Sequence, residues 1–169
     1  MISAGSHLSA GPSPLARCAA LGQDGCMKII VGVDGSPSSA RAVEWCAAHA
    51  AALGAEVVAV FSLDIPIYAA SGFGIAPIPA PLPPEPDRGV VRDEIEREWC
   101  APLSNAKVPF RVVVTDGEPA PAIMAVAEKE TADLVVTGRR GRGGFAELLL
   151  GSTSHALSHH LNRPLVIVP

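Results

Sequence analysis

The chain of 169 residues is poor in aromatic residues and charges and has no long apolar run, and each absence excludes a class of protein. Aromatic residues make up 4% and charged residues 18%, whereas 49% is hydrophobic, which excludes a chain disordered by composition. The best candidate for a membrane span, residues 45–63, is interrupted by His49, Gly54 and Glu56, so we expect no membrane partner. The net charge of -4 lacks the basic excess typical of nucleic-acid binding, so we expect no nucleic-acid partner.

The four cysteines, Cys18, Cys26, Cys46 and Cys100, form no CxxC pair and no regular disulfide framework. A chain of this length and apolar content does not need disulfides to stabilise a core. We therefore expect reduced thiols and a cytoplasmic protein.

Residues 1–26 show no pattern typical of a folded segment or of a targeting signal. They lack the basic start and the apolar core of a secretory signal, and a single Arg makes a transit peptide a poor match. We interpret them as a disordered leader, or as the product of an upstream start codon that is not used. The folded part is expected to be one domain over residues 27–169.

From Met27 onward, short β-branched runs alternate with Ala-rich segments of helical character. The pattern predicts strands over residues 28–33, 56–63, 110–114, 134–137 and 165–168. It predicts helices over about residues 37–53, 90–100, 119–131 and 151–161, with Pro102 limiting the second and a proline-rich loop over 66–89 before it. Because strands and helices alternate, we predict an α/β fold: a doubly wound, five-stranded parallel sheet with helices on both faces.

The segment after the fourth strand, GRRGRGGFAELLLGS over residues 138–152, is rich in glycine and arginine. In doubly wound sheets, ligands lie at the carboxyl ends of the strands, where this segment begins. Gly138, Gly141 and the pair at 143–144 are expected to curl the backbone so that consecutive N–H groups form an anion-binding nest. Three arginines among these glycines add positive charge.

The next helix begins with Gly151, Ser152 and Thr153. This start adds N–H donors, two hydroxyls and the positive end of the helix dipole. Together with the glycines before it, it predicts a site for a polyphosphate. The simpler interpretation is that the glycines are ordinary turn residues and the arginines are solvated.

Two better-known phosphate motifs do not fit. A Walker A loop is excluded because no Lys follows any of these glycines. A dinucleotide fingerprint matches superficially at residues 141–146, but it follows the fourth strand instead of the first. It also lacks an acidic residue about 20 positions further on to bind a ribose.

Several segments, in order along the chain, resemble the universal stress protein family. The spacing G-x2-G-x9-G-S that begins at Gly138 is similar to the glycine pattern of its ATP-binding branch. IIVGVDGS, which contains Asp34, resembles the family's first strand and turn. Residues 117–138 resemble its third helix and fourth strand, and RPLVIVP resembles its last strand. The resemblance covers residues 27–169.

The resemblance implies a nucleotide-responsive regulatory protein of stress response. Its expected ligand is ATP, alone or with Mg2+ or Mn2+. ADP, AMP or a cyclic nucleotide remain open as other ligands. The resemblance also implies the strand order 3-2-1-4-5 and a homodimer formed through residues 165–168. Family members often carry His-Val where this chain has Phe61 and Ser62. The resemblance assigns the adenosine part to Val33, Asp34 and Ser62, and the phosphates to Gly138, Arg140, Gly141, Gly151, Ser152 and Thr153.

Several of these positions and their neighbours also have simpler interpretations. Asp34 could be a turn residue that binds its own backbone, and Ser36 is expected to cap the following helix. His155 and His159 lie four apart, but no third metal ligand is apparent, which favours surface histidines.

Trp45 and Trp99 are the two tryptophans of the chain. A buried indole contributes a large apolar surface to a core. We therefore expect both to be packing residues rather than stacking platforms.

Two classes of function remain open from the sequence: a nucleotide-binding regulator, and an enzyme such as a slow ATPase or a nucleotidyl transferase. Hydrolysis needs a residue that orients water and carboxylates that hold magnesium. Asp34 and Glu147 are the acids expected near the glycine segment, so at most weak ATP hydrolysis is expected. A dimeric adaptor that does not use nucleotide is a third class, which the intact glycine spacing argues against.

Overall fold

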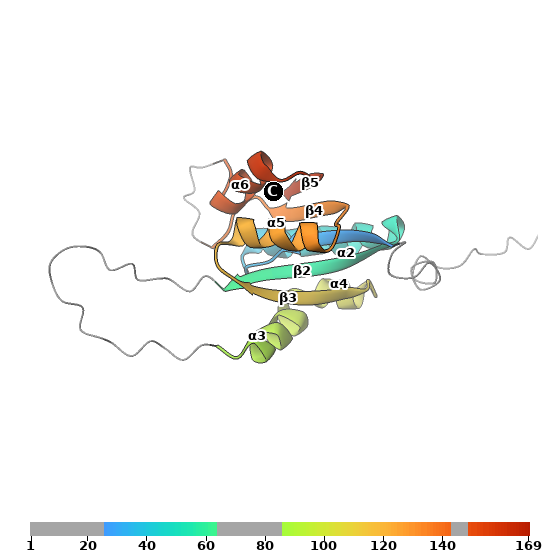
Figure 1. Cartoon of the computed structure of the whole chain (residues 1–169). Helices are drawn as coiled ribbons and strands as arrows, with labels where there is room; N and C mark the ends of the chain where they lie inside the picture. Colours follow the sequence, from blue (N-terminus) through green and yellow to red (C-terminus); the bar gives the residue numbers. More distant parts are fainter. Residues whose placement is uncertain (1–25, 64–85, 143–148) are drawn as a thin grey trace, which may run out of the picture.

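Five parallel strands form one sheet in the order β3-β2-β1-β4-β5 in the computed structural model, which describes residues 26–63, 86–142 and 149–169 (Figure 1). The predicted fold class and strand order are confirmed, and the strand ends differ from the prediction by at most two residues. The strands are β1 (Met27–Gly32), β2 (Ala55–Leu63), β3 (Phe110–Asp116), β4 (Leu134–Gly138) and β5 (Leu165–Val168).

The central strand β1 is buried on both faces of the sheet. Ile29 and Val31 lie in one hydrophobic core and Ile30 lies in the other. β1 pairs in parallel with β2 on one side and with β4 on the other. An unbroken β-branched run suits such a strand, because helices cover both of its faces.

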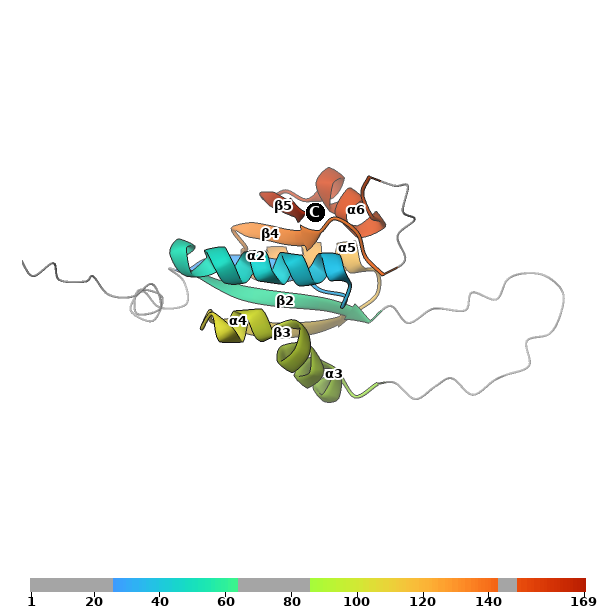
Figure 2. The ribbon, with the colours of Figure 1, turned by 180° about the vertical axis from the view of Figure 1, so that it is seen from behind.

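Helices cover the two faces as predicted (Figures 1 and 2). One face carries α2 (Pro37–Leu53), α3 (Arg88–Glu94) and α4 (Ala101–Asn105), and the other carries α5 (Pro119–Lys129) and α6 (Ser152–His160). Val43 and Leu103 belong to the core of the first face, and Ile123 and Leu157 belong to that of the second. The result is a three-layered α/β arrangement.

The chain changes direction across the sheet between β1 and β4. From β1 it passes through β2 to β3 at one edge, and it then returns to β4 and β5 on the other side. Doubly wound sheets bind ligands at such a switch point, beyond the carboxyl ends of the strands. The residues that follow Gly32 and Gly138 therefore define the candidate site.

The helical segment between β2 and β3 differs from the single helix predicted over residues 90–100. α3 begins after Asp87, whose side chain caps it, and continues into one turn of π-helix, η2 (Ile95–Trp99). α4 follows directly with Pro102 in its first turn, so Pro102 does not end the helical segment as expected. The first turn of a helix tolerates proline because the N–H that proline lacks would have no partner there.

Smaller differences concern the ends of loops and helices. The predicted loop over residues 66–89 is shorter at its end, because α3 includes Arg88 and Gly89. Residues 64–85 of this region lie outside the described residues. α5 and α6 end one or two residues before their predicted ends.

The expectation of reduced cysteines is confirmed at Cys46 and Cys100, which are free and buried. Burial raises the pKa of each of these thiols to about 12, so both remain protonated at neutral pH. The expectation is wrong at Cys26, which takes part in a disulfide and stands before β1, where its sulfur is only partly buried. Cys18 lies outside the described residues.

The predicted leader falls outside the described residues except for Cys26. In the three described ranges, none of the helices has the length and apolar character needed to cross a membrane.

Candidate functional site

Asp34 and Ser36 organise the turn between β1 and α2. One carboxylate oxygen of Asp34 accepts the N–H of Ser36 at 2.9 Å, and Gly35 between them has a φ of 73°. The Ser36 hydroxyl oxygen accepts the N–H of Ser39 at 3.1 Å and so caps α2, as predicted. Asp34 is therefore a turn residue, in agreement with the simpler interpretation.

The second carboxylate oxygen of Asp34 contacts the glycine segment that follows β4. It accepts the N–H of Arg142, 108 positions away in sequence, at 3.2 Å. A Cβ at Gly141 would lie 2.7 Å from the same oxygen, so the carboxylate approaches this backbone as closely as glycine allows. Asp34 thus also connects the carboxyl ends of β1 and β4.

Val33 and Ser62, which were assigned to the adenosine, lie in different surroundings. Val33 is buried beside the turn, and its N–H donates to the Val60 carbonyl at 2.9 Å. Beyond Val60, β2 continues for three residues alongside β3. Ser62 lies on this extension, and its hydroxyl donates to the carbonyl of Gly117 after β3. The structure therefore brings Val33 next to Asp34 but binds the Ser62 side chain on the β3 side.

Three buried serines hold the glycine segment against the starts of α2 and α6. Ser38 accepts the N–H of Arg140 at 3.3 Å, and Ser36 donates to the Arg140 carbonyl at 3.4 Å. From α6, Ser154 donates to the carbonyl of Arg139 at 2.8 Å. Sequence analysis did not identify Ser38 or Ser154, which belong to the serine clusters SPSS and GSTS at the two helix starts.

Gly138 and Gly151 allow backbone segments to approach closely. A Cβ at Gly138 would lie 2.5 Å from the carbonyl carbon of Ser38, which shows how tightly α2 lies against the end of β4. A Cβ at Gly151 would lie 3.1 Å from the Cα of Arg140 and 3.4 Å from the nitrogen of Gly141. The structure therefore brings together the residues that were assigned to the phosphates.

Backbone N–H groups of the glycine segment are largely bound inside the protein. Those of Arg139, Arg140 and Arg142 each donate to an acceptor on a neighbouring element, at distances of 2.7 to 3.3 Å. These three N–H groups therefore do not form the expected nest, because each is already bound to an acceptor within the fold. Residues 143–144 of the expected nest lie outside the described residues.

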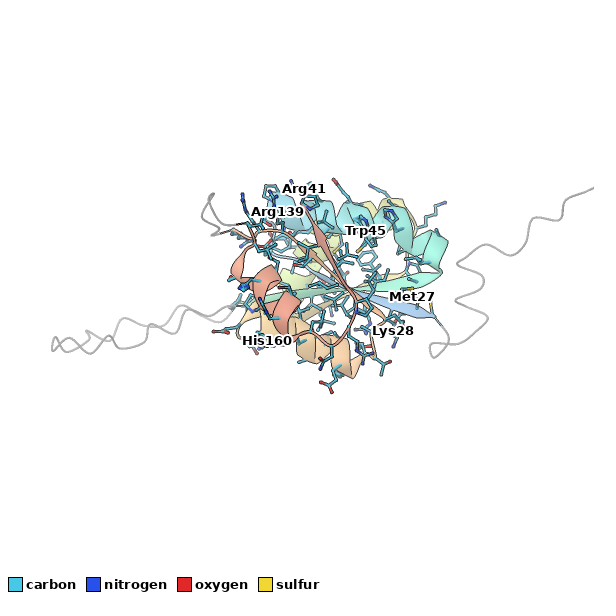
Figure 3. The ribbon with its side chains drawn as sticks, turned by 90° about the horizontal axis from the view of Figure 1, so that it is seen from above. Met27, Lys28, Arg41, Trp45, Arg139 and His160 are labelled. Carbon is cyan, nitrogen blue, oxygen red and sulfur yellow. The ribbon has the colours of Figure 1, made fainter. Side chains whose placement is uncertain are left out.

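The start of α6 lies against the same segment. Its N-cap residue is Gly151, and within the described residues no side chain caps the first turn and no acidic residue occurs in it. Ser152 is exposed and Thr153 is half-buried. The partial positive charge of a helix start and two hydroxyls therefore lie beside Arg140 and Gly141. Figure 3 shows this end of the sheet, marked by Arg139, opposite the end marked by Met27 and Lys28.

An aromatic pair that the sequence does not indicate borders the Asp34 turn. Trp99 from η2 and Phe61 from β2 meet edge to face, with ring centroids 5.4 Å apart. The Arg142 guanidinium lies over the Trp99 ring, 5.1 Å from its centroid. Trp99 also packs against the core beneath α2, as predicted, but its side chain is only partly buried there.

His155 and His159 on α6 are exposed, and their ring centroids are 4.5 Å apart. Within the part of the chain that the structure describes, no three His, Cys, Asp or Glu residues are arranged to hold a metal ion. The candidate site is thus built from hydroxyls, glycines, arginines and the carboxylate of Asp34.

Sequence comparisons relate the whole described chain to one family. The model of the universal stress protein family matches residues 26–169. Universal stress protein YxiE of Bacillus subtilis is 31% identical over 150 residues, which are 83% of this chain and 97% of YxiE. Several mycobacterial universal stress proteins are 33% or 34% identical, and this chain spans less than half of their length.

Solved structures of universal stress proteins share the fold. One in complex with cAMP matches with a TM-score of 0.59 and 26% identity, over 85% of this chain and 96% of that chain. One from Archaeoglobus fulgidus in complex with dAMP matches with a TM-score of 0.57 and 18% identity, over 85% and 98% of the two chains. At 18% identity, the second likeness shows the fold alone.

Proposed function

The chain belongs to the universal stress protein family, and on that premise we propose that it is a regulatory protein of a stress response that binds ATP. The observation that carries the proposal is the contact between Asp34 and the glycine segment, which joins the carboxyl ends of β1 and β4 at the switch point. An adenine nucleotide is further supported by the relative solved with cAMP.

The phosphates are assigned to the side of the site that carries positive charge. The start of α6 at Gly151, Ser152 and Thr153 offers a helix dipole and two hydroxyls, and Arg140 and the glycine segment lie against it. Since the N–H groups of three loop residues are already bound, the helix start and the arginine side chains are the main donors. Gly138 and Gly141 contribute by letting these backbone segments approach one another.

The adenosine is assigned to the side of Asp34. Its carboxylate now accepts the N–H of Arg142, and a phosphate at the same place would face the repulsion of a second anion. The ribose hydroxyls and base of an adenosine carry no charge, and they can donate hydrogen bonds to a carboxylate. Val33 lies beside this turn. The pairing of β2 with β1 ends at Val60, so the β2 backbone at Ser62 lies past the part that pairs with β1.

We propose binding rather than efficient turnover. Asp34 is the carboxylate that contacts the glycine segment in the described residues, and both of its oxygens accept backbone N–H groups. A metal-assisted hydrolysis would need further carboxylates or a residue that orients water. Mg2+ or Mn2+ would enter with the phosphates of ATP and supply charge neutralisation there.

The proposal is tested first by identifying the nucleotide that copurifies with the protein, using mass spectrometry, and then by calorimetry with ATP. Ser152→Ala removes one hydroxyl that donates to a charged phosphate. We expect ATP binding to weaken by about 10- to 150-fold while adenosine binding is retained. Ser158→Ala is the matched control, because Ser158 lies on the same helix and bonds to the His155 carbonyl.

Asp34→Ala tests the other half of the site. We expect it to weaken ATP and adenosine by a similar factor, since it acts on the part that both ligands share. Equal ATP affinity in the parent protein, Ser152→Ala and Asp34→Ala would contradict the proposed site.

A homodimer through β5 is the second part of the proposal. β5 lies at the edge of the sheet, pairs with β4, and its apolar residues Leu165, Val166 and Ile167 remain half-exposed. An edge strand without a blocking charge is a template for pairing with another copy. We expect Ile167→Lys to give a folded monomer. Light scattering that finds the parent protein monomeric at micromolar concentration would contradict the dimer.

A further inference from the structure

Trp99 lies at the border between the core and the candidate site. It ends η2, a single π-helical turn, and such turns occur frequently at functional sites. Its ring is partly buried against the core and forms a T-shaped contact with the ring of Phe61. The other tryptophan, Trp45, stacks on His49 on α2 with ring centroids 4.3 Å apart. Of the two indoles, Trp99 is the one that contacts the Asp34 turn.

One face of the Trp99 ring is covered by a side chain of the glycine segment. The Arg142 guanidinium lies over it at 5.1 Å, which is the geometry of a cation–π contact. Arg142 is exposed, and its backbone N–H is the one that binds Asp34. The guanidinium therefore rests on the indole directly beside the residue to which we assign the adenosine.

Gly35 shows how closely the two planar groups approach the turn. A Cβ at this position would lie 2.7 Å from Nη2 of Arg142 and 2.7 Å from a ring carbon of Trp99. Its φ of 73° also favours glycine. The indole and the guanidinium are thus held against the backbone next to Asp34, with no side chain between them.

We propose that Trp99 is a specificity-determining residue of the nucleotide site, whose indole stacks on the purine base once Arg142 has turned to the phosphates. The inference rests on the proposed function. A charge-assisted contact between guanidinium and phosphate is stronger than an exposed cation–π contact, so a polyphosphate draws Arg142 from the ring. The ring face left behind is planar and apolar, and it lies beside the assigned adenosine position. A base is the part of the ligand that matches this surface.

Removing the indole should therefore affect ATP and inorganic tripolyphosphate differently. We expect Trp99→Leu to weaken ATP binding by about 5- to 150-fold, the range found for loss of one base–aromatic stack, and to leave tripolyphosphate binding nearly unchanged. Trp99→Phe, which keeps a smaller ring, should restore part of the ATP affinity. A purely structural role would lower the affinity for both ligands equally. Trp45→Leu is the matched control, because it removes an indole that packs on the same core away from the site.

Fluorescence gives a second test that leaves Trp99 unchanged. In Trp45→Phe, Trp99 is the sole tryptophan of the chain. We expect ATP to quench its emission by stacking, and tripolyphosphate, which lacks a base, to leave it unquenched. Calorimetry on the same protein shows whether each ligand binds.

The outcomes separate the two proposals. If the parent protein binds no adenine nucleotide, the proposed function is wrong. If it binds ATP, and Trp99→Leu changes ATP and tripolyphosphate affinity by the same factor, the stacking role is wrong. Equal effects of ATP and tripolyphosphate on the emission of Trp99 would also overturn it.

Discussion

The two ends of the parallel sheet are built from different chemistry. At the amino end, Lys28 of β1 lies 3.9 Å from Glu56 of β2 and 3.5 Å from Glu130 after α5, and Arg111 of β3 lies 2.6 Å from Glu130. At the carboxyl end, buried serines and glycines bind the loops between β1 and β4 to helix starts, and one ion pair, Arg88 with Asp116 at 2.6 Å, lies at the end of β3. The amino end is therefore held by a charged cluster around Glu130, whereas the carboxyl end between β1 and β4, to which we assign the nucleotide, is held by hydroxyls and close glycine contacts.

Substitutions at the two ends are therefore expected to have different effects. A change at the amino end should alter the free energy of unfolding and leave ligand affinity unchanged. A change at the carboxyl end should alter ligand affinity more than stability. Sites about one strand length apart, with no shared partners, are expected to behave additively.

Gly141→Val is expected to have the largest effect. The new side chain would meet the Asp34 carboxylate, whose oxygen lies 2.7 Å from the Cβ position. We expect ATP affinity measured by calorimetry to fall by at least about 100-fold, equivalent to about 2.7 kcal/mol. Because Asp34 is displaced as well, adenosine affinity should also fall, in contrast to Ser152→Ala. Unchanged ATP affinity in a folded Gly141→Val protein would mean that this end of the sheet is not the binding end.

Glu130→Gln is expected to be the largest change at the amino end. Burial by itself would raise the pKa of Glu130, but the hydrogen bond and charge of Arg111, with the charge of Lys28, outweigh it and lower the pKa below its ordinary value. Both cations lose their shared partner in the variant. Since Arg111 is about half exposed, solvent weakens its pair, and we expect a loss of about 1–2 kcal/mol in the free energy of unfolding at pH 7.

The pH dependence of this loss has a definite sign. A carboxyl group with a lowered pKa in the folded protein stabilises the fold above its unfolded-state pKa, and this stabilisation is lost as the pH falls through the folded-state value. The difference between parent and Glu130→Gln, measured by urea unfolding, should therefore be full at pH 7 and shrink below about pH 4. A difference that stays constant down to pH 3 would exclude the ion pairs as its cause.

Much of the fold could be predicted from the sequence, because strands, helices and helix caps depend on residues that are close together in the chain. Runs of Val and Ile predict the strands, Ala-rich segments predict the helices, and Ser36 followed by proline predicts the start of α2. Pro102 was misinterpreted because proline ends a helix in its interior but not in its first turn. Where a π-helical turn joins two helices, the local sequence does not show whether a proline lies in a helix interior or in the first turn of the next helix.

The site was predictable to a smaller extent, since its contacts join distant parts of the chain. The glycine spacing correctly suggests that the end of β4 lies close to the start of α6. In the structure, Gly151 at the start of α6 packs against Arg140, which follows β4. Ser38 and Ser154 were missed because a hydroxyl at a helix start is as common on a surface as in a buried contact. Arg142 over Trp99 depends on the path of two loops, which no pattern in either segment specifies.

Gly54→Ala sharpens the comparison by changing a glycine at the amino end. Gly54 ends α2 with a φ of 61°, and a Cβ there would meet nothing within 4 Å. The cost is therefore backbone strain alone, about 1 kcal/mol in the free energy of unfolding. ATP affinity should equal that of the parent in calorimetry. A fall in affinity as large as that of Gly141→Val would show that glycine substitutions act through general loss of structure.

Glu56→Gln is expected to have the smallest effect and asks whether the charges of the amino end act together. The distance of 3.9 Å to Lys28 is at the limit of an ion pair, and both side chains are partly exposed, so we expect a loss of a few tenths of a kcal/mol. In a Glu130→Gln background, however, Lys28 has lost its nearer acid, and its ammonium group can turn fully to Glu56. The same Glu56→Gln substitution should then cost more, with a coupling of about 0.5 kcal/mol in a double-mutant cycle measured by urea unfolding at low salt. If the two losses are additive, Lys28 does not link the acids, and the amino end is a set of independent pairs.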